Sequence, residues 1–160
     1  GLDRYAADPP QAMVGEAEVT ALHRVLRAEL PHGAREAVCR DAGRRTALYL
    51  LEHRIPRLVR ALLAALPAQA ASHLLLAAIR RHAWTFAGSA RFSAVSGKPV
   101  GLSIEGCALC RGATLDAPAC AYYAATFEGL FRALVHPQAR AAETACAACG
   151  ADACRFEVRW

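Results

Sequence analysis

Four residues in the last third of the chain have side chains that bind zinc in proteins: Cys120, Glu143, Cys146 and Cys154. Cys120 lies at the start of an expected helix, and the other three lie near the adjoining ends of two expected strands. Structural zinc sites are closed, with four protein ligands in a tetrahedron. An ion bound by these three thiolates and one carboxylate would hold the helix against the strands. The sequence therefore predicts a zinc site that constrains the topology of the C-terminal half.

The end of the chain alternates between two kinds of side chain. Cysteine and apolar residues occupy every second position from Cys154 to Trp160, and charged residues lie between them. Strict alternation is typical of a half-buried antiparallel strand. Residues 139–145 can pair with this strand as a hairpin, and Gly150 is suited to a positive φ in the turn. Cys154 is therefore expected to point into the core.

The periodicity of apolar residues predicts the remaining elements. Helical spacing marks four segments, at residues 22–30, 34–66, 67–81 and 119–136. Period-two or β-rich stretches mark three strand candidates, at residues 84–86, 91–95 and 100–105. Pro56 should break the second helical segment, and Pro118 fits the first turn of the helix that follows it. The order predicts an α+β fold, with N-terminal helices packed on a small antiparallel sheet and a long helix before a zinc-stapled C-terminal hairpin.

Other interpretations of the cysteines remain open. Buried free cysteines are common and behave as small hydrophobic residues. A disulfide framework is disfavoured because seven cysteines is an odd number and no signal peptide is visible. A further arrangement joins Cys107 and Cys110 with Cys146 and Cys149 around zinc or an iron–sulfur cluster. It ranks lower, because the interval between the two pairs exceeds the usual zinc-ribbon spacing.

The residues around the predicted zinc site also carry a family resemblance. The run Cys-Ala-Tyr-Tyr-Ala-Ala-Thr-Phe-Glu-Gly-Leu-Phe from Cys120, the run Glu-Thr-Ala-Cys and the run Gly-Ala-Asp-Ala-Cys-Arg-Phe resemble the vinyl-4-reductase domain, especially its bacteriochlorophyll-biosynthesis members. The family includes sensor domains of aromatic-responsive regulators and shares its fold with TRAPP-type transport subunits. The resemblance implies a structural zinc held by Cys120, Glu143, Cys146 and Cys154. It assigns no ligand role to Cys107 or Cys149, which are interpreted as spare.

The length of the chain, 160 residues, is sufficient for one domain with a proper core. Residues 1–14 are predicted to be a poorly ordered tail, and residues 15–160 a single vinyl-4-reductase-like ligand-binding domain. No targeting segment is expected. Residues 61–79 are uncharged and long enough to span a membrane, but Pro67 favours two helices meeting there. A cytoplasmic protein with at most peripheral membrane contact is predicted.

The net charge of +5 comes almost entirely from arginine, since Lys98 is the only lysine. The arginines are scattered along the helices without an aromatic platform, whereas nucleic-acid binding requires a contiguous basic patch. No nucleic-acid partner is therefore predicted. The resemblance implies a homodimer that pairs through the N-terminal helices.

The sequence favours a binding protein over an enzyme. The glycines at positions 97, 101, 106 and 112 are spaced wrongly for a dinucleotide-binding fingerprint. A zinc with four protein ligands has no open position for water or substrate, so its role would be structural. No catalytic residue is predicted.

The resemblance implies a tetrapyrrole ligand, namely a protoporphyrin, its magnesium complex or a protochlorophyllide. Such a ligand suits aromatic walls, a cation for the carboxylates and an imidazole for the metal. The candidate ligand-binding residues are His73, Arg81, His82, Trp84, Phe92, Tyr123 and Phe127, with Arg80 and Phe86 as further possibilities. The favoured function is a carrier that delivers pigment intermediates to enzymes such as the magnesium chelatase. The alternatives are an 8-vinyl reductase with an external reductant and a small-molecule sensor.

Overall fold

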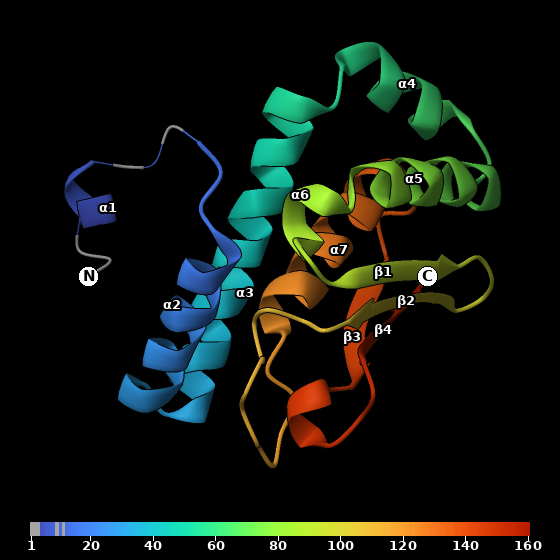
Figure 1. Ribbon diagram of the computed structural model, residues 1–160. Helices are drawn as coiled ribbons and strands as arrows, with labels where there is room; N and C mark the ends of the chain where they lie inside the picture. The colour runs from blue at the N-terminus through green and yellow to red at the C-terminus, as the bar shows by residue number, and fades with distance from the viewer. Residues whose placement is uncertain (1–3, 9, 11) are drawn as a thin grey trace.

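The computed structural model describes residues 4–8, 10 and 12–160. The helices are α1 (Arg4–Ala7), α2 (Glu16–Glu29), α3 (His32–Tyr49), α4 (Arg57–Ala65), α5 (Ala68–His82), α6 (Trp84–Ala87) and α7 (Ala121–Leu134). The strands are β1 (Arg91–Val95), β2 (Val100–Glu105), β3 (Arg140–Ala145) and β4 (Cys154–Arg159). Two shorter turns are the π-helical η1 (Leu50–Arg54) and the 3-10 helical η2 (Ala147–Cys149). Figure 1 shows helices and one small sheet, which confirms the predicted α+β class.

The four strands form one antiparallel sheet in the order β1-β2-β4-β3. The predicted C-terminal hairpin is confirmed, with Glu143 opposite Phe156. The pairing is irregular between Glu143 and Ala145, where β3 ends. Bulges of this kind redirect side chains at the ends of strands. The irregularity therefore lies at the end of β3 that carries a predicted zinc ligand.

Helix α7 forms a central layer between α3 and the sheet (Figure 1). Small residues allow α3 to approach it closely. A Cβ at Gly43 would lie 2.3 Å from the carbonyl oxygen of Tyr122, and a Cβ at Gly129 would lie 2.6 Å from the Cβ of Ala47. The other side of α7 buries Tyr123 and other apolar side chains against the sheet. Helix α7 is therefore covered by α3 on one side and by the sheet on the other.

Two local predictions have opposite outcomes. The predicted break at Pro56 is confirmed, since η1 ends at Arg54 and α4 begins at Arg57. The predicted strand at residues 84–86 is wrong, because these residues form helix α6. The amide of Ala87 donates to the carbonyl of Ala83, and Gly88 ends the turn with φ 60°. A run of three residues is too short for periodicity to separate strand from helix, and here the short helix α6 follows α5 after one residue, Ala83.

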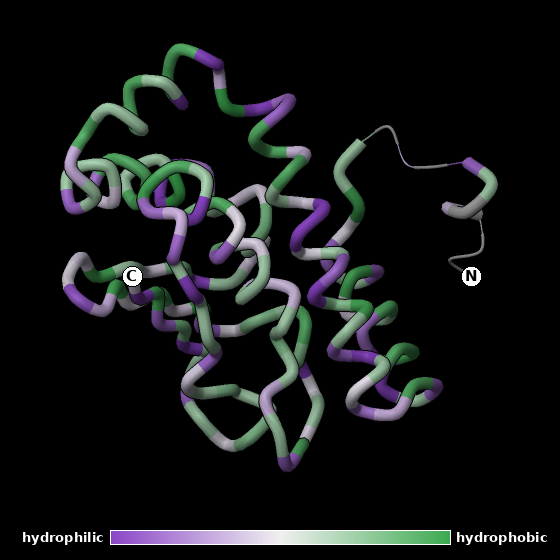
Figure 2. The backbone as a smooth tube through the Cα atoms, turned by 180° about the vertical axis from the view of Figure 1, so that it is seen from behind, coloured by the Kyte–Doolittle hydropathy of each residue, from purple (hydrophilic) through white to green (hydrophobic). Residues whose placement is uncertain are grey.

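The predicted N-terminal tail contains the short helix α1, whose Tyr5 hydroxyl donates to Glu18 of α2 at 2.6 Å. Residues 1–3, 9 and 11 of that tail lie outside the described residues, and the domain boundary stays a prediction. In the part of the chain that the structure describes, no helix combines the length and apolar character required to cross a membrane. Figure 2 shows hydrophobic and hydrophilic residues interleaved along the helices.

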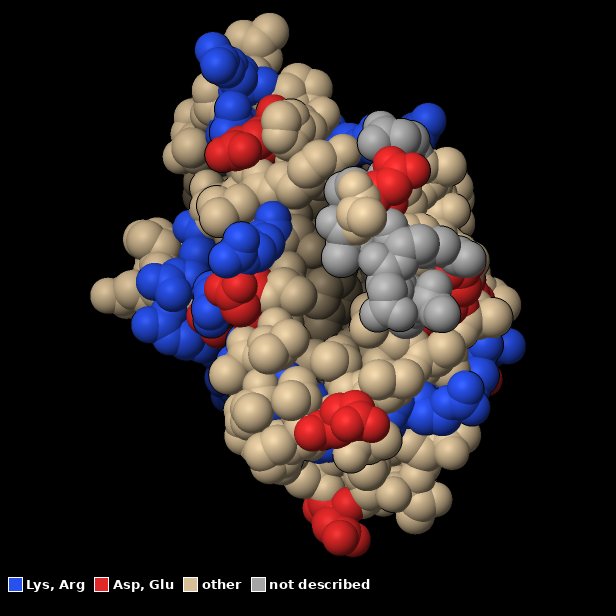
Figure 3. All heavy atoms as spheres, turned by 90° about the vertical axis from the view of Figure 1, so that its left-hand side faces the viewer, with Lys and Arg blue, Asp and Glu red and all other residues tan. Residues whose placement is uncertain are grey.

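Positive and negative side chains are interspersed on the face of the molecule that Figure 3 presents. Several of the arginines pair with acidic side chains of their own helix. On α3, Arg40 bonds to Glu36 at 2.9 Å and Arg45 bonds to Asp41 at 2.6 Å. These exposed pairs are typical of a solvated helix surface.

Candidate metal centre

The structure brings the four predicted zinc ligands together. Cys120 precedes the first residue of α7, Glu143 lies on β3, Cys146 follows that strand, and Cys154 begins β4. The three sulfurs and one carboxylate oxygen all lie within 4.8 Å of one another. The three cysteines are almost fully buried. The helix start and both ends of the hairpin turn thus contribute to one enclosed group of ligand atoms.

The carboxylate of Glu143 shows why this group suits a cation. Its Oε2 accepts a hydrogen bond from the backbone N–H of Cys120 at 2.8 Å. Its Oε1 is buried and has no hydrogen-bond partner among the described residues. Burial raises the pKa of Glu143 to about 8. A buried oxygen without a partner is unfavourable, and coordination of a metal ion by Oε1 would satisfy it.

The sulfur atoms have the spacing that a tetrahedral ion requires. Cys120 Sγ and Cys154 Sγ are 3.6 Å apart, and zinc–sulfur bonds of 2.3 Å place two sulfurs of one tetrahedron about 3.8 Å apart. The backbone N–H of Ala147 donates to Cys154 Sγ at 3.5 Å. A hydrogen bond from Cys120 lowers the pKa of Cys146 to about 5, despite the opposing effect of burial. The spacing of these sulfurs therefore fits zinc, which cysteine sulfur binds in its deprotonated form.

The turn after β2 brings two further cysteines to this centre. Cys107 Sγ lies 3.5 Å from Cys120 Sγ, and Cys110 Sγ lies 3.4 Å from Cys154 Sγ. These four sulfurs form a second group whose members lie within 4.8 Å of one another. Cys107, interpreted as spare from the sequence, has its thiol buried inside the cluster. The Cys-x-x-Cys spacing of this turn was the sequence signal for it.

In the residues that it describes, the structure does not contain the alternative arrangements of the cysteines that the sequence left open, a disulfide framework and a site made of two Cys-x-x-Cys pairs. All seven cysteines, each of which the structure describes, are free, so the cluster is not a disulfide framework. Cys149 is exposed and belongs to neither group of ligands. The arrangement that pairs Cys107 and Cys110 with Cys146 and Cys149 is therefore not formed. The first pair instead lies beside Cys120 and Cys154.

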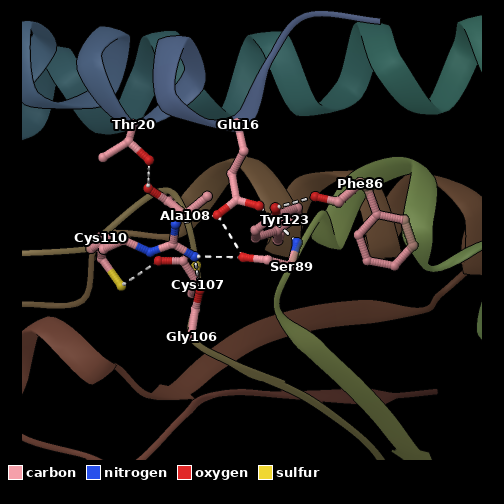
Figure 4. Close-up of polar contacts among 10 residues, drawn as sticks. Glu16, Thr20, Phe86, Ser89, Gly106, Cys107, Ala108, Cys110 and Tyr123 are labelled. Carbon is pink, nitrogen blue, oxygen red and sulfur yellow. Dashed lines mark hydrogen bonds and ion pairs between the residues drawn. The ribbon is translucent and has the colours of Figure 1, made fainter.

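Helix α2 covers the turn that carries Cys107 and Cys110 (Figure 4). The hydroxyl of Thr20 donates to the carbonyl of Ala108 at 3.0 Å, and Arg27 donates to the carbonyl of Leu109 at 2.6 Å. His23 lies between these two residues on α2 and is buried, and burial lowers its pKa to about 4. Helix α2 is thereby attached to the cysteine-bearing turn.

A second set of contacts attaches the start of α2 to the same region (Figure 4). Glu16 accepts hydrogen bonds from the amide of Ser89 at 2.7 Å and from its hydroxyl at 2.9 Å, and it also pairs with Arg111. Arg111 in turn donates to the carbonyl of Gly106 at 2.7 Å. Through these bonds Glu16 connects α2, the end of α6 and the turn after β2.

The predicted ligand-binding residues separate into a group in or against the core and an exposed group. Phe92, Tyr123 and Phe127 belong to one aromatic cluster with Phe86 and Phe156, with ring centroids 5.3 to 6.3 Å apart. The hydroxyl of Tyr123 donates to the carbonyl of Phe86 at 2.9 Å (Figure 4). The exposed group comprises His73, Arg81, His82 and Trp84. The structure thus brings the three aromatic residues together and leaves the other four at the surface.

Two hollows in the protein surface lie away from these residues. One, of about 370 Å³, lies along the sheet and is lined by residues that include Ser103, Arg155 and Glu157. The other, of about 140 Å³, lies beside Lys98 and Trp160. None of the seven predicted ligand-binding residues lines either hollow. The rings of the aromatic cluster are closely packed in this structure, so they would have to move apart for a ligand to bind between them.

Comparison with known proteins identifies the class to which this fold and cysteine cluster belong. Residues 100–160 match the V4R domain, so the chain is a V4R-domain protein. It belongs to the family of the bacteriochlorophyll synthase 23 kDa chain. The protein of that name from Cereibacter sphaeroides is 45% identical, and the match covers 94% of this chain and 72% of the relative. The protein of the same name from Rhodobacter capsulatus is 36% identical over 92% of this chain and 68% of the relative.

Two solved structures share the fold. The phenol-responsive sensory domain of the transcription activator PoxR, solved with phenol, has a TM-score of 0.67 at 18% identity, over 92% of this chain and 75% of that one. Trafficking protein particle complex subunit 3 from Naegleria fowleri, covalently bound to palmitic acid, has a TM-score of 0.60 at 10% identity, over 90% and 93% of the two chains. The family resemblance seen in the sequence is therefore confirmed.

Proposed function

We propose that this chain is a cytoplasmic accessory protein of bacteriochlorophyll biosynthesis that binds a tetrapyrrole intermediate and delivers it to the enzymes of the pathway, the magnesium chelatase among them. The names of its relatives support the pathway. The observation that carries the binding role is the arrangement of α7. One end of this helix meets the metal centre at Cys120, and its next turns hold Tyr123 and Phe127 in the aromatic cluster.

Zinc in this proposal is structural. Cys120, Glu143, Cys146 and Cys154 would hold it, and the bound ion would staple the start of α7 to the hairpin of β3 and β4. A site with four protein ligands has no vacant position for a substrate. The chain's own residues therefore serve to bind and orient a ligand, with no catalytic group among them.

The tetrapyrrole is proposed to enter where α6 and β1 cover the aromatic cluster. Phe86 on α6 and Phe92 on β1 stack edge to face at 5.3 Å over the rings of α7. Helix α6 has only four residues and one hydrogen bond from Tyr123 to Phe86 joins it to α7. Displacing α6 would expose flat aromatic walls, with Arg81 and His82 nearby in the chain to meet the carboxylates and the central metal.

Titration of the purified protein with protoporphyrin and with its magnesium complex tests this proposal. We expect a shift of the Soret band and quenching of tryptophan fluorescence at micromolar protein. Phe127→Leu should weaken binding at least tenfold. Phe131→Leu is the matched control on the same helix, because Phe131 is equally buried but contacts Trp160 outside the cluster. The absence of any spectral shift in the wild-type protein would contradict the proposal.

The same preparation separates the alternative functions. A vinyl reductase would convert a divinyl substrate into a measurable product with NADPH or dithionite, whereas a carrier would return the ligand unchanged. A sensor related to the phenol-responsive domain would bind simple phenols in preference to tetrapyrroles. Sedimentation of the free and loaded protein would test the homodimer, which is part of this proposal.

A further inference from the structure

We infer that the centre holds two metal ions, bridged by the thiolates of Cys120 and Cys154. The inference starts from the two groups of ligand atoms, each compact enough for one ion, which share these two cysteines. The first group adds Glu143 and Cys146 to the shared pair, and the second adds Cys107 and Cys110. The inference adds a second ion to the single zinc of the proposed function, and it does not depend on tetrapyrrole binding.

The number of ligands matches what two tetrahedral ions require. Two tetrahedra that share an edge have six corners, of which two are shared and two belong to each ion alone. The shared edge is the pair Cys120 and Cys154, whose sulfurs are 3.6 Å apart. Cys107 lies 3.5 Å from one shared sulfur and Cys110 lies 3.4 Å from the other. These separations are close to the tetrahedral edge of about 3.8 Å expected for zinc thiolates.

The charges of the six ligands also favour two ions over one. Five thiolates and one carboxylate carry six negative charges in a buried volume. Two divalent ions reduce the net charge of the six ligands to −2. The four-ligand site of one zinc, with three thiolates and one carboxylate, has the same net charge. A single ion would leave the two sulfurs of Cys107 and Cys110 either uncompensated or protonated. Burial of uncompensated charge is unfavourable.

The turn that carries Cys107 and Cys110 is held in a fixed shape. Gly106 and Gly112, on either side of it, have φ values of 79° and 68°, which L side chains rarely adopt. Beyond the turn, the amide of Leu115 donates to the carbonyl of Ala148 at 2.8 Å. Thr20 and Arg27 of α2 hold the carbonyls between the cysteines, as described above. Both sulfurs therefore point to the shared pair in a prearranged site.

The chemistry of the ligands indicates the kind of ion. Thiolate-rich tetrahedral sites suit zinc and other soft d10 ions. Protein sulfurs already occupy the bridging positions, where an iron–sulfur cluster would place inorganic sulfide. The inferred centre is therefore a thiolate-bridged pair of zinc ions. The second ion would connect the turn after β2, and through it helix α2, to the hairpin.

Metal analysis of the full chain, purified without chelator, tests the inference. We expect two zinc ions per chain in the wild-type protein and one in Cys107→Ser and in Cys110→Ser. Cys39→Ser and Cys149→Ser should keep both ions, since these cysteines belong to neither group. The inference would be overturned if the wild-type protein held one zinc ion per chain and Cys107→Ser held the same amount of zinc as the wild type. Iron with acid-labile sulfide would also overturn it.

A second measurement guards against variants that do not fold. Wild-type protein loaded with cadmium should give two cadmium-113 resonances in the range of sulfur-rich sites, coupled to each other through the bridging sulfurs. A single resonance, or two without coupling, would contradict shared cysteines. Neither readout involves a tetrapyrrole, so a protein that fails to bind pigment can still hold two ions, and the two hypotheses fail separately.

Discussion

The C-terminal half and the N-terminal helices of this molecule differ in how completely they bury their apolar residues. In the sheet, Val100, Ile104 and Val158 are fully buried beneath α7. On α4, by contrast, Leu58 is 85% exposed and Leu62 is 57% exposed. The sheet, α7 and the cysteine cluster thus bury their apolar residues, whereas α4 presents apolar surface. The match to the V4R domain, residues 100–160, lies in the well-buried part.

This difference indicates which forces hold each half. The C-terminal half combines the antiparallel sheet with six clustered side chains that could hold metal, so removing one of them should disturb it strongly. The N-terminal helices depend on close packing against α7 and on a few polar contacts to the cysteine-bearing turn. Their apolar surface agrees with the homodimer expected from the family resemblance, which stays a prediction.

The largest effect is expected from Cys154→Ser, because Cys154 belongs to both groups of ligands. We expect this variant to lose its bound metal and to lose on the order of 5 kcal/mol of unfolding free energy, since binding of a structural metal contributes directly to folding. Metal analysis and urea denaturation provide the measurements. Cys149→Ser should remain within about 0.5 kcal/mol of wild type. Full metal content and stability in Cys154→Ser would disprove the role of this cysteine.

The next effect is a pH dependence that arises in the N-terminal half. Burial lowers the pKa of His23 to about 4, from an ordinary value of 6.5. Between these values the unfolded chain binds a proton that the folded chain does not, so the unfolding free energy should fall as pH drops from 6.5 to 4. The loss attributable to His23 is on the order of 3 kcal/mol.

Denaturation of wild type and His23→Leu across this pH range isolates the contribution of His23. The variant should show a shallower loss of stability with acidification, while acid release of metal affects both proteins alike. If the unfolding free energies of the two proteins fell in parallel with pH, protonation of His23 in the folded state would not lower stability, and the prediction would be wrong.

A third effect concerns the contact between the two halves at α3 and α7. Gly43→Ala places a Cβ against the backbone carbonyl of Tyr122, at 2.3 Å, and should destabilise the protein by about 1–3 kcal/mol. Gly33→Ala is the matched control on the same helix, since no atom lies within 4 Å of its added Cβ. Alanine at position 33 should leave stability unchanged or raise it slightly. Equal melting curves for the two variants would show that the helices separate more easily than their spacing indicates.

The smallest effect is expected at the polar contact between α2 and the cysteine-bearing turn. Thr20→Val removes the hydrogen bond to the carbonyl of Ala108 and should cost about 1 kcal/mol. Hydrogen exchange at the amides of α2 should increase, while exchange in β4 should remain slow. Thr85→Val is a control, because its hydroxyl bonds only locally, to the carbonyl of His82. Uniformly faster exchange through the whole chain would mean that the two halves unfold together.

Much of the candidate metal centre could be predicted from local sequence. The alternation that ends at Trp160 directs Cys154 inward, and the turn at Gly150 returns the chain to place Glu143 and Cys146 beside it. The exposed positions of His73 and Trp84 could not be predicted, because sequence proximity to a helix end does not determine which way that end faces. The strand expected at residues 84–86 was wrong for the related reason that three residues carry too little periodicity.

The sequence by itself determined the α+β class, the C-terminal hairpin and the ligand atoms that meet there, because period-two alternation, proline and glycine act over a few residues. Only the tertiary structure decided that the turn after β2 folds back to bring Cys107 and Cys110 against Cys120 and Cys154. It also decided that Phe86 and Phe92 close over the rings of α7. These contacts join segments that are distant along the chain, and their formation depends on how α2, α7 and the sheet pack together.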